Sequence, residues 1–442
     1  MKILPLGVRL LCSWLLFFAY PLHAEHLMQA GSFATNRLSL AEAIELSIQR
    51  QPLLQSLDEA AKASRSAAIA EAQLPDPKVK LGIINLPATR QDAFHVDREP
   101  MTMTSIGLEQ EMVPQAKREA AAHYLNAEAR QYETEQLVSQ RSIQKAVAIA
   151  WLETYAAQRK SALYQQIIDT MQAERKVALG AASAGGNPLS DVLKLDAQLA
   201  AARDKSLMAQ LEERKARAGL ARWLGEDAKR PLSDEMQLYT PQRRAWAAVS
   251  PRAELEDNPQ LMNARQQEAV AVSDLDRAQL GRLSNWSWEV GYGKRFAGQS
   301  DMVTFQVAFD LQTDRAHRQD QRTAEKQLLL ERARKLTEDR HRELSAALEA
   351  ARAEWEIAEA REQEHQQRLI PAADARLKLL EAAYRAGRPN LAEVWQAKRD
   401  VLEVQIEHLN ILVERQRAAI NIAFLLNDEH FFTAQSATGS RP

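Results

Sequence analysis

Few residues in this chain have side chains and spacings that could do chemistry, and none of them forms a catalytic motif. The chain holds no His-Glu-x-x-His zinc motif, no phosphate-binding glycine loop and no Gly-x-Ser-x-Gly elbow. Its carboxylates mostly interleave with Lys and Arg along helical faces, a pattern that is typical of solvated surfaces. We therefore predict a protein that is not an enzyme and that needs no cofactor.

Two small groups of residues are nevertheless chemically suggestive. Met101, Met103 and His95 are candidate soft-metal ligands, because thioethers and imidazoles bind soft and borderline cations. The alternative is favoured: they are strand and loop residues that face lipid or solvent, and no metal is held. Asp191 and Glu393 each follow a turn rich in Gly, Pro and Asn, and a carboxylate in the first turn of a helix stabilises its N-terminus.

The composition restricts the elements that can position these residues. The 442 residues include only 15 Gly and 16 Pro, too few turn formers for an all-β chain or a loop-rich α/β enzyme. The apolar fraction of 45% is ordinary for a folded protein. With 57 basic and 59 acidic residues, the charge balance gives no electrostatic case for nucleic-acid binding.

The N-terminus has the pattern of an export signal. Lys2 and Arg9 precede an apolar run over 10–20, and the small residue Ala24 follows, so we expect a cleavable signal peptide over 1–24. An uncleaved anchor is the alternative, which the shortness of the apolar run disfavours. The single cysteine, Cys12, lies inside this signal, which excludes disulfides and gives a poor lipoprotein signal.

Long tracts without Gly or Pro predict very long helices. Gln115–Leu179 is one such tract, and a helix over 115–182 would be roughly 100 Å long, more than the diameter of a compact domain. Two shorter helices are expected beside it, over 39–74 and 188–224. The first opens with a capping box formed by Ser39 and Glu42.

The same plan occurs twice along the chain. Alternating residues predict strands at about 78–86 and 101–111, and again at about 287–296 and 302–311. Helices are expected over 254–283, over 314–386 with a kink at Pro371, and over 391–427. We therefore divide the chain into an N-terminal extension (25–37), repeat 1 (38–229), a linker (230–250), repeat 2 (251–430) and a C-terminal tail (431–442).

The predicted fold is mainly α with a small β part, built as two tandem repeats of helix, β-hairpin, long helix and helix. Four strands cannot close a barrel alone, but three chains would supply twelve. The strands of an exported chain would then pool across subunits into a membrane barrel, with the helices as a tube beneath it. A periplasmic coiled-coil scaffold without a pore is the alternative.

The sequence resembles the TolC family of outer-membrane efflux ducts over about 38–427. The resemblance rests on Leu38-Ser39-Leu40-Ala41-Glu42-Ala43-Ile44 with Gln51-Pro52, on Tyr384-Arg385-Ala386-Gly387 with Leu391-Ala392-Glu393-Val394, and on the repeat-1 counterpart Gly186-Asn187-Pro188-Leu189-Ser190-Asp191-Val192-Leu193. The loop from Asn85 to Thr102 is similar to that of the heavy-metal branch, the CzcC- and CusC-like ducts. A drug or small-organic exporter of the same family is the alternative.

The resemblance implies an assembly and a set of partners. Members of the family are homotrimers, with a 12-stranded β-barrel in outer-membrane lipid above a periplasmic α-barrel. A periplasmic adaptor (membrane fusion) protein and an inner-membrane RND pump dock onto them, and the duct itself is passive. The expected location is therefore the outer membrane of a bacterial cell, with a large periplasmic portion.

The resemblance also implies roles for particular residues. Asp191, Glu393 and Tyr384 match the gate at the periplasmic mouth, where acids from three chains would favour cations. The turns at the two helical tips would dock the adaptor, through Gly185, Gly186, Pro188, Gly387 and Pro389. Strand aromatics would form a belt at the bilayer surface, or alternatively pack between strand and helix: Trp286, Trp288, Phe296, Phe305 and Phe309.

Overall fold

The computed structural model describes residues 37–49, 51–183, 189–234, 236, 239–241, 251–296, 298–386 and 391–433. All elements below belong to the unit that begins at Leu38. The predicted signal peptide and residues 25–36 of the predicted extension lie outside the described residues.

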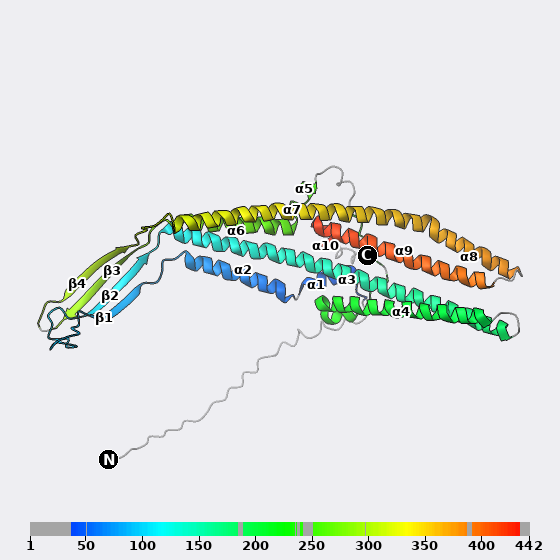
Figure 1. Ribbon diagram of the computed structural model, residues 1–442, viewed down its shortest axis with the longest axis horizontal. Helices are drawn as coiled ribbons and strands as arrows, with labels where there is room; N and C mark the ends of the chain where they lie inside the picture. Colours follow the sequence, from blue (N-terminus) through cyan, green and yellow to red (C-terminus); the bar gives the residue numbers. More distant parts are fainter. Residues whose placement is uncertain are drawn as a thin grey trace, which may run out of the picture. The chain divides into compact units, whose positions relative to one another are not determined.

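The first half of this unit is organised around one very long helix. Helix α3 runs without interruption over Gln115–Ser183, close to the predicted bounds. Helices α1 (Leu40–Gln49), α2 (Pro52–Glu71) and α4 (Leu189–Leu224) all pack on it. Figure 1 shows α1 and α2 following each other along one part of α3 and α4 along the other. The shorter helices thus lie end to end beside the long one.

The single helix predicted over 39–74 is wrong, because the chain breaks at Pro52. Gln51 is extended (φ −91°, ψ 113°), since the proline ring after it disfavours helical backbone there. Its side-chain amide donates to the carbonyl oxygens of Ser47 (2.6 Å) and Trp223 (3.1 Å). Ser39 does accept the backbone N–H of Glu42 (3.2 Å), as a cap should.

The second half repeats this plan with a break at the matching proline. It contains α5 (Pro251–Glu254), α6 (Pro259–Leu280), α7 (Gln319–Glu364), α8 (Ile370–Arg385), α9 (Leu391–Leu425) and α10 (Glu429–Thr433). The helix predicted over 254–283 is wrong at its start, where Asn258 caps α6. The Asn258 side chain accepts from the backbone N–H groups of Gln260 and Leu261 and donates to the Leu425 carbonyl (2.7 Å).

The second long helix is not one regular α-helix. A π-helical turn, η3 (His365–Leu369), joins α7 to α8 directly before Pro371. The N–H of Ile370 bonds to the carbonyl of His365, five residues back, as a π-turn requires. The predicted disturbance at Pro371 is therefore an inserted wide turn, and the helix begins at Gln319 and not near residue 314.

The four strands form one antiparallel sheet in the order β1-β2-β3-β4. They are β1 (Lys78–Ile84), β2 (Met103–Met112), β3 (Trp286–Arg295) and β4 (Met302–Phe309), within two residues of the predicted bounds at every end. The hairpins of the two halves join through β2 and β3, with Met103 opposite Arg295 and Met112 opposite Trp286. Figure 1 shows the sheet extending from the ends of α3 and α7.

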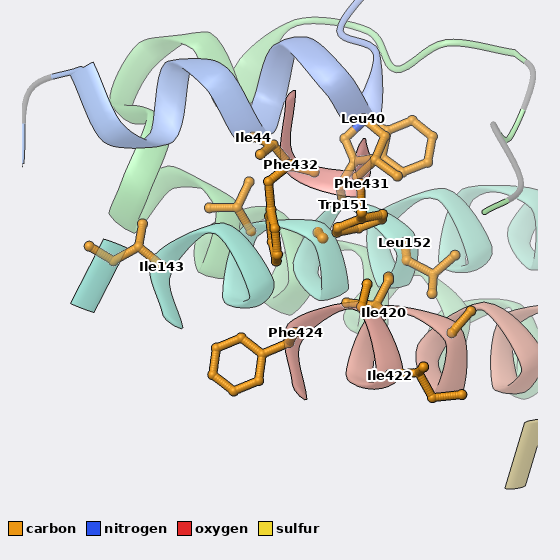
Figure 2. Close-up of a cluster of buried hydrophobic side chains, with 14 of the residues drawn as sticks. Leu40, Ile44, Ile143, Trp151, Leu152, Ile420, Ile422, Phe424, Phe431 and Phe432 are labelled. Carbon is orange, nitrogen blue, oxygen red and sulfur yellow. The ribbon is translucent and has the colours of Figure 1, made fainter. Parts of the chain in front are cut away.

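The main hydrophobic core joins both halves at mid-length of α3. Trp151 is fully buried there, stacks on Tyr155 and donates its indole N–H to the Leu38 carbonyl (3.0 Å). Figure 2 shows side chains from α1, α3, α9 and α10 meeting around it. Phe431 and Phe432, which the sequence analysis assigned to the tail, are buried in this core, so that boundary is wrong. The last residues, 434–442, lie outside the described part.

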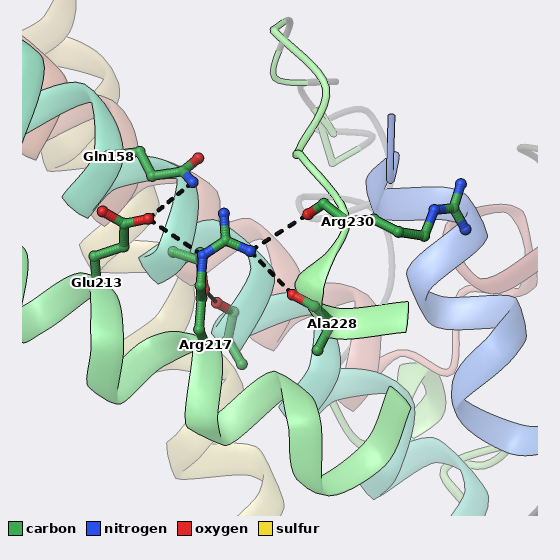
Figure 3. Close-up of polar contacts among 7 residues, drawn as sticks. Gln158, Glu213, Arg217, Ala228 and Arg230 are labelled. Atoms are coloured by element: carbon green, nitrogen blue, oxygen red, sulfur yellow. Dashed lines mark hydrogen bonds and ion pairs between the residues drawn. The ribbon is translucent and has the colours of Figure 1, made fainter. Parts of the chain in front are cut away.

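Polar contacts fix the start of the linker against α4. Arg217 pairs with Glu213 (3.2 Å) and donates to the carbonyl oxygens of Ala228 (3.0 Å) and Arg230 (3.3 Å), as Figure 3 shows. Gln158 of α3 donates to the same Glu213 carboxylate (3.0 Å). The linker then forms a parallel bridge between Leu232 and Leu38. The Glu42 carboxylate pairs with Arg230 (2.7 Å), which the capping-box interpretation did not anticipate.

No helix in the described part of the chain is both long and apolar enough to cross a membrane.

Candidate functional site

The sheet has two faces of opposite character. Cross-strand partners in an antiparallel sheet share a face, so the register places the apolar members of all four strands together. These side chains are 38% to 75% exposed in the single chain. The exposed apolar members of this face are Val79, Leu81, Ile83, Ile106, Leu108, Trp286, Val290, Tyr292, Val303, Phe305, Val307 and Phe309. Such a continuous exposed apolar surface is large for a water-facing protein and marks a surface made to be covered.

The opposite face carries charges in an ordered cluster. Glu109 and Glu289 stand directly opposite each other on β2 and β3, an arrangement that like charges disfavour. The ammonium group of Lys80 resolves it, lying 2.6 Å from a carboxylate oxygen of each. Lys80 reaches over Gly107, where an added Cβ would meet the Glu289 carboxylate at 3.3 Å. Alternation alone did not predict this triad, because its members are far apart in sequence.

The predicted aromatic residues take different positions on the sheet. Trp286 and Phe309 are cross-strand partners at the helical end of the sheet, and their rings stack with centroids 6.3 Å apart. Trp288 pairs with Val307, and Phe305 pairs with Val290 nearer the middle. Phe296 lies in a bend just beyond β3, at the opposite end. The aromatic residues that lie within the strands all share the apolar face, but they lie at different heights along it. An aromatic belt at the bilayer surface therefore stays a prediction.

The sheet is open at both edges. Strands β1 and β4 are its outer members, and each pairs with only one neighbour within the chain. Their exposed edges present unpaired backbone N–H and C=O groups that can accept another strand. A sheet with two free edges and one apolar face is thus incomplete as a single chain.

At the far end from the sheet, the two helical hairpins enclose a groove. It measures about 590 Å³ and lies between α3 and α4 of the first half and α8 and α9 of the second. Arg399 of α9 pairs there with Glu174 of α3, and both side chains are nearly buried (11% and 13% exposed). Burial raises the pKa of the Glu174 carboxyl, and the Arg399 charge opposes that rise. This pair could not be predicted from local sequence patterns, because its members are 225 positions apart.

Only some of the predicted gate residues line this groove. Tyr384 lines the groove near the end of α8 and is 46% exposed. Glu393 is an exposed residue in the first turn of α9. Asp191 lies in the first turn of α4, but its side chain is outside the described part. The predicted docking turns at 185–188 and 387–390 also fall outside it, so these assignments stay predictions.

The structure does not bring the candidate metal ligands together into a site. His95 is exposed in the loop after β1, and Met101 is 46% exposed with its sulfur 4.0 Å from Arg295. Met103 is buried on β2, close to Gly293. Among the described residues, no group of three or more His, Cys, Asp or Glu side chains is placed to hold a metal ion.

The fold is shared with solved bacterial outer-membrane channels. The chain is similar to CusC, a protein that forms a transmembrane channel, with 14% identity over 88% of this chain and 91% of that one (TM-score 0.72). It is similar to the outer-membrane protein VceC of Vibrio cholerae, with 15% identity over 88% and 95% (TM-score 0.70). The MtrE outer-membrane channel of Neisseria gonorrhoeae gives 14% identity over 88% of each chain (TM-score 0.68).

These likenesses exist in structure and not in overall sequence. No protein-family model matches the chain, and no curated protein sequence does either. CusC does not stand apart from the other channels in TM-score, so the fold does not single out the heavy-metal branch. At these identities the likeness concerns the fold, and the chain thus has the fold of the TolC-family outer-membrane efflux channels that its sequence resembles.

Proposed function

We propose that this chain is the outer-membrane channel subunit of a tripartite, RND-type efflux system. It would be a passive gated duct that carries cargo from a periplasmic adaptor and inner-membrane pump to the outside of the cell. The fold shared with solved outer-membrane channels supports this proposal, and the two-faced sheet is the observation that carries it.

The open sheet supports an assembly of three copies. A barrel needs an apolar outer face against lipid, a polar inner face against water and no free edges. One chain supplies both faces, through the apolar surface of Val79 to Phe309 and the Lys80–Glu109–Glu289 cluster, but leaves β1 and β4 unpaired. Pairing β4 of one copy with β1 of the next would close a homotrimeric barrel of twelve strands, with Trp286 and Phe309 at one bilayer surface.

The helical end would form the periplasmic part of the duct. Asp191 and Glu393 would stand at the mouth, where three copies of each acid attract cations and resist close approach to one another. Tyr384, which lines the groove between the hairpins, would contribute to the same gate. The turns at 185–188 and 387–390 would meet the tips of the adaptor.

Membrane extraction and single-channel recording test this proposal. We expect the mature protein in the outer-membrane fraction, released only by detergent, as a trimer by native mass spectrometry. In planar bilayers it should conduct ions. Release by salt or alkaline washing as a conductance-free assembly would instead support the alternative, a periplasmic coiled-coil scaffold.

Once channel activity has been recorded, substitutions of the acids test the proposed gate. Glu393→Ala or Asp191→Ala should raise conductance and weaken cation selectivity, because each change removes three charges from the mouth. Glu45→Ala, at an exposed acid on α1, is the matched control and should leave both unchanged. Unchanged currents in all three variants would show that Asp191 and Glu393 are not part of the gate. The proposal of a channel would not be affected.

Heavy-metal cations are the cargo that we propose, on the resemblance of the Asn85–Thr102 loop to the metal branch. A deletion strain should then become sensitive to divalent or monovalent soft-metal salts and keep its resistance to organic drugs. The opposite sensitivity would favour the alternative, a drug or small-organic exporter with the same fold. Because a duct should release its cargo readily, the absence of clustered ligands among Met101, Met103 and His95 is compatible with either cargo.

A further inference from the structure

The π-turn in the second half lies against a pair of histidines that the proposed duct does not use. His365 is the first residue of η3, and His408 lies on α9, which packs against η3. Their rings are stacked, with centroids 6.4 Å apart and planes at 22°. Within the described part of the chain, the Nδ1 atoms of both rings are buried and have no hydrogen-bond partner.

The charges around this pair are already balanced without the histidines. From α7, Glu362 is buried and pairs with Arg415 of α9, and its other oxygen accepts from Gln366 (3.1 Å). Arg361 of α7 pairs with Glu407 (3.1 Å) and Glu414 (2.7 Å) of α9. A proton added to the His408 imidazole would therefore find Glu362 already engaged and Arg415 close by.

The remaining elements near this place hold their charges in pairs of their own. Within η3, Arg368 pairs with Glu364 (3.2 Å), and Arg376 of α8 pairs with Asp400 of α9 (2.5 Å). Helix α3 packs on the other side of α9, where Glu153 pairs with Arg417 (2.9 Å). The Lys160 ammonium on α3 lies 3.7 Å from a Glu212 carboxylate of α4.

The backbone at this place is the weakest point of the long helix. A π-turn widens the helix, and Pro371 follows it without an N–H to donate. Burial lowers the pKa of His408, and the neighbouring His365 and Arg415 lower it further against the opposing effect of Glu362. The neutral ring is therefore the form that the packed structure favours.

We propose that His365 and His408 form a pH-responsive joint between η3 and α9. With the His408 ring neutral, the joint is closed and α8 packs on α9. When His408 is protonated, its added positive charge lies against the His365 ring and beside Arg415, and the α8 arm separates from α9 at the π-turn. The signs agree: a histidine that folds neutral contributes stability above about pH 6.5, its unfolded pKa, and loses it as the pH falls below that value.

Hydrogen–deuterium exchange on the full-length, detergent-solubilised protein tests the joint, at pH 7.5 and pH 5.0 with correction for intrinsic rates. In the wild type, amides over 365–385 and 400–412 should lose at least tenfold in protection at pH 5.0. Amides in the matching stretch of α3, over 164–183, should not. The double variant His365→Gln/His408→Gln should keep its protection at both pH values, because glutamine does not titrate.

The controls make the outcome decisive. His317→Gln, at a largely exposed histidine paired with Asp314, should behave as the wild type. Circular dichroism at pH 7.5 checks that every variant keeps its helices. If the double variant loses them, the single variants His365→Gln and His408→Gln replace it in the exchange experiment. An equal loss of protection in wild type and folded variants, or no loss in the wild type, would overturn the joint.

Discussion

The two long helices of this chain have the same place in the repeated plan and yet differ in build. Helix α3 runs for 69 residues as one regular α-helix, whereas its counterpart is divided by η3 and Pro371 into α7 and α8. By contrast, an earlier helix break at a proline is common to both halves, at Pro52 in the first and at Pro259 in the second. The two long helices therefore differ at η3 and Pro371. A duplicated fold can thus keep one of its long helices straight and give the other a joint.

The contacts of the two arms agree with this difference. The α3 arm is tied into the main core by Trp151, and nearer its tip it is tied to α9 by the nearly buried pair of Glu174 with Arg399. No residue of α8 is buried among those the structure describes, and its ion pairs with α9, Arg376 with Asp400 and Glu381 with Lys398, are partly exposed. We expect the first half to act as the stave and the second as the part that moves.

A proline placed in α3 should have the largest effect. Thr170 occupies the position in α3 that Pro371 occupies in the second half, counted from Gly186 and Gly387 at the two tips. Thr170→Pro removes an interior hydrogen bond and should cost about 3 kcal/mol in free energy of unfolding. Pro371→Ala is the matched control and should be neutral or slightly stabilising. Thermal and urea unfolding of the solubilised protein measure both, and equal losses would contradict the difference between the arms.

Truncating the buried arginine should come next in size. Arg399→Ala leaves Glu174 of α3 buried without its partner, at a cost of about 2 to 3 kcal/mol. The exposed counterpart, Arg376→Ala, should cost less than about 1 kcal/mol. Comparable losses in the two variants would show that the ties between the halves are no stronger than those within the second half.

The loss of stability in Arg399→Ala should depend on pH. The pKa of Glu174 is already raised by burial, and removal of the Arg399 charge raises it further. A carboxyl group whose pKa is higher in the folded state makes the protein more stable as the pH falls through that pKa. The deficit of Arg399→Ala relative to wild type should therefore shrink between pH 7 and pH 5, measured by urea unfolding. A deficit that grows on acidification would contradict this account.

The sequence predicted elements better than contacts, for a physical reason. Tracts without Gly or Pro and alternating strands are local patterns, so α3, α9 and all four strands lie close to their predicted bounds. Pro52 and Pro259 were visible in the sequence, but whether a proline starts a helix or bends one depends on partners such as Trp223 and Leu425. The burial of Phe431 likewise depends on a core contributed by distant segments.

The candidate site divides in the same way. The apolar face of the sheet follows from alternation, which places Val303, Phe305, Val307 and Phe309 on one side of β4. The triad of Lys80, Glu109 and Glu289 needs the strand order and the register, which no single strand encodes. The pair of His365 and His408 needs the packing of η3 on α9.

The sheet supplies the smallest expected effect, because its facing acids are partly exposed. Glu109 comes from the first half and Glu289 from the second, and each has a carboxylate oxygen 2.6 Å from the Lys80 ammonium. Glu109 also stands opposite Lys78 on β1, whereas Glu289 stands opposite the neutral Gln306 on β4. Glu109→Gln and Glu289→Gln should therefore each change stability by less than about 1 kcal/mol, with Glu109→Gln the less favourable of the two.

Removing the shared cation instead should reveal the repulsion. Lys80→Gln leaves two carboxylates face to face, and we expect a loss of about 1 kcal/mol at low salt that shrinks as salt screens the pair. Addition of Glu109→Gln to Lys80→Gln should restore most of this loss, because only one acid then remains. Thermal unfolding at two salt concentrations measures the four variants beside the wild type. A larger loss in Glu289→Gln than in Glu109→Gln, or no recovery in the double variant, would contradict this account of the cluster.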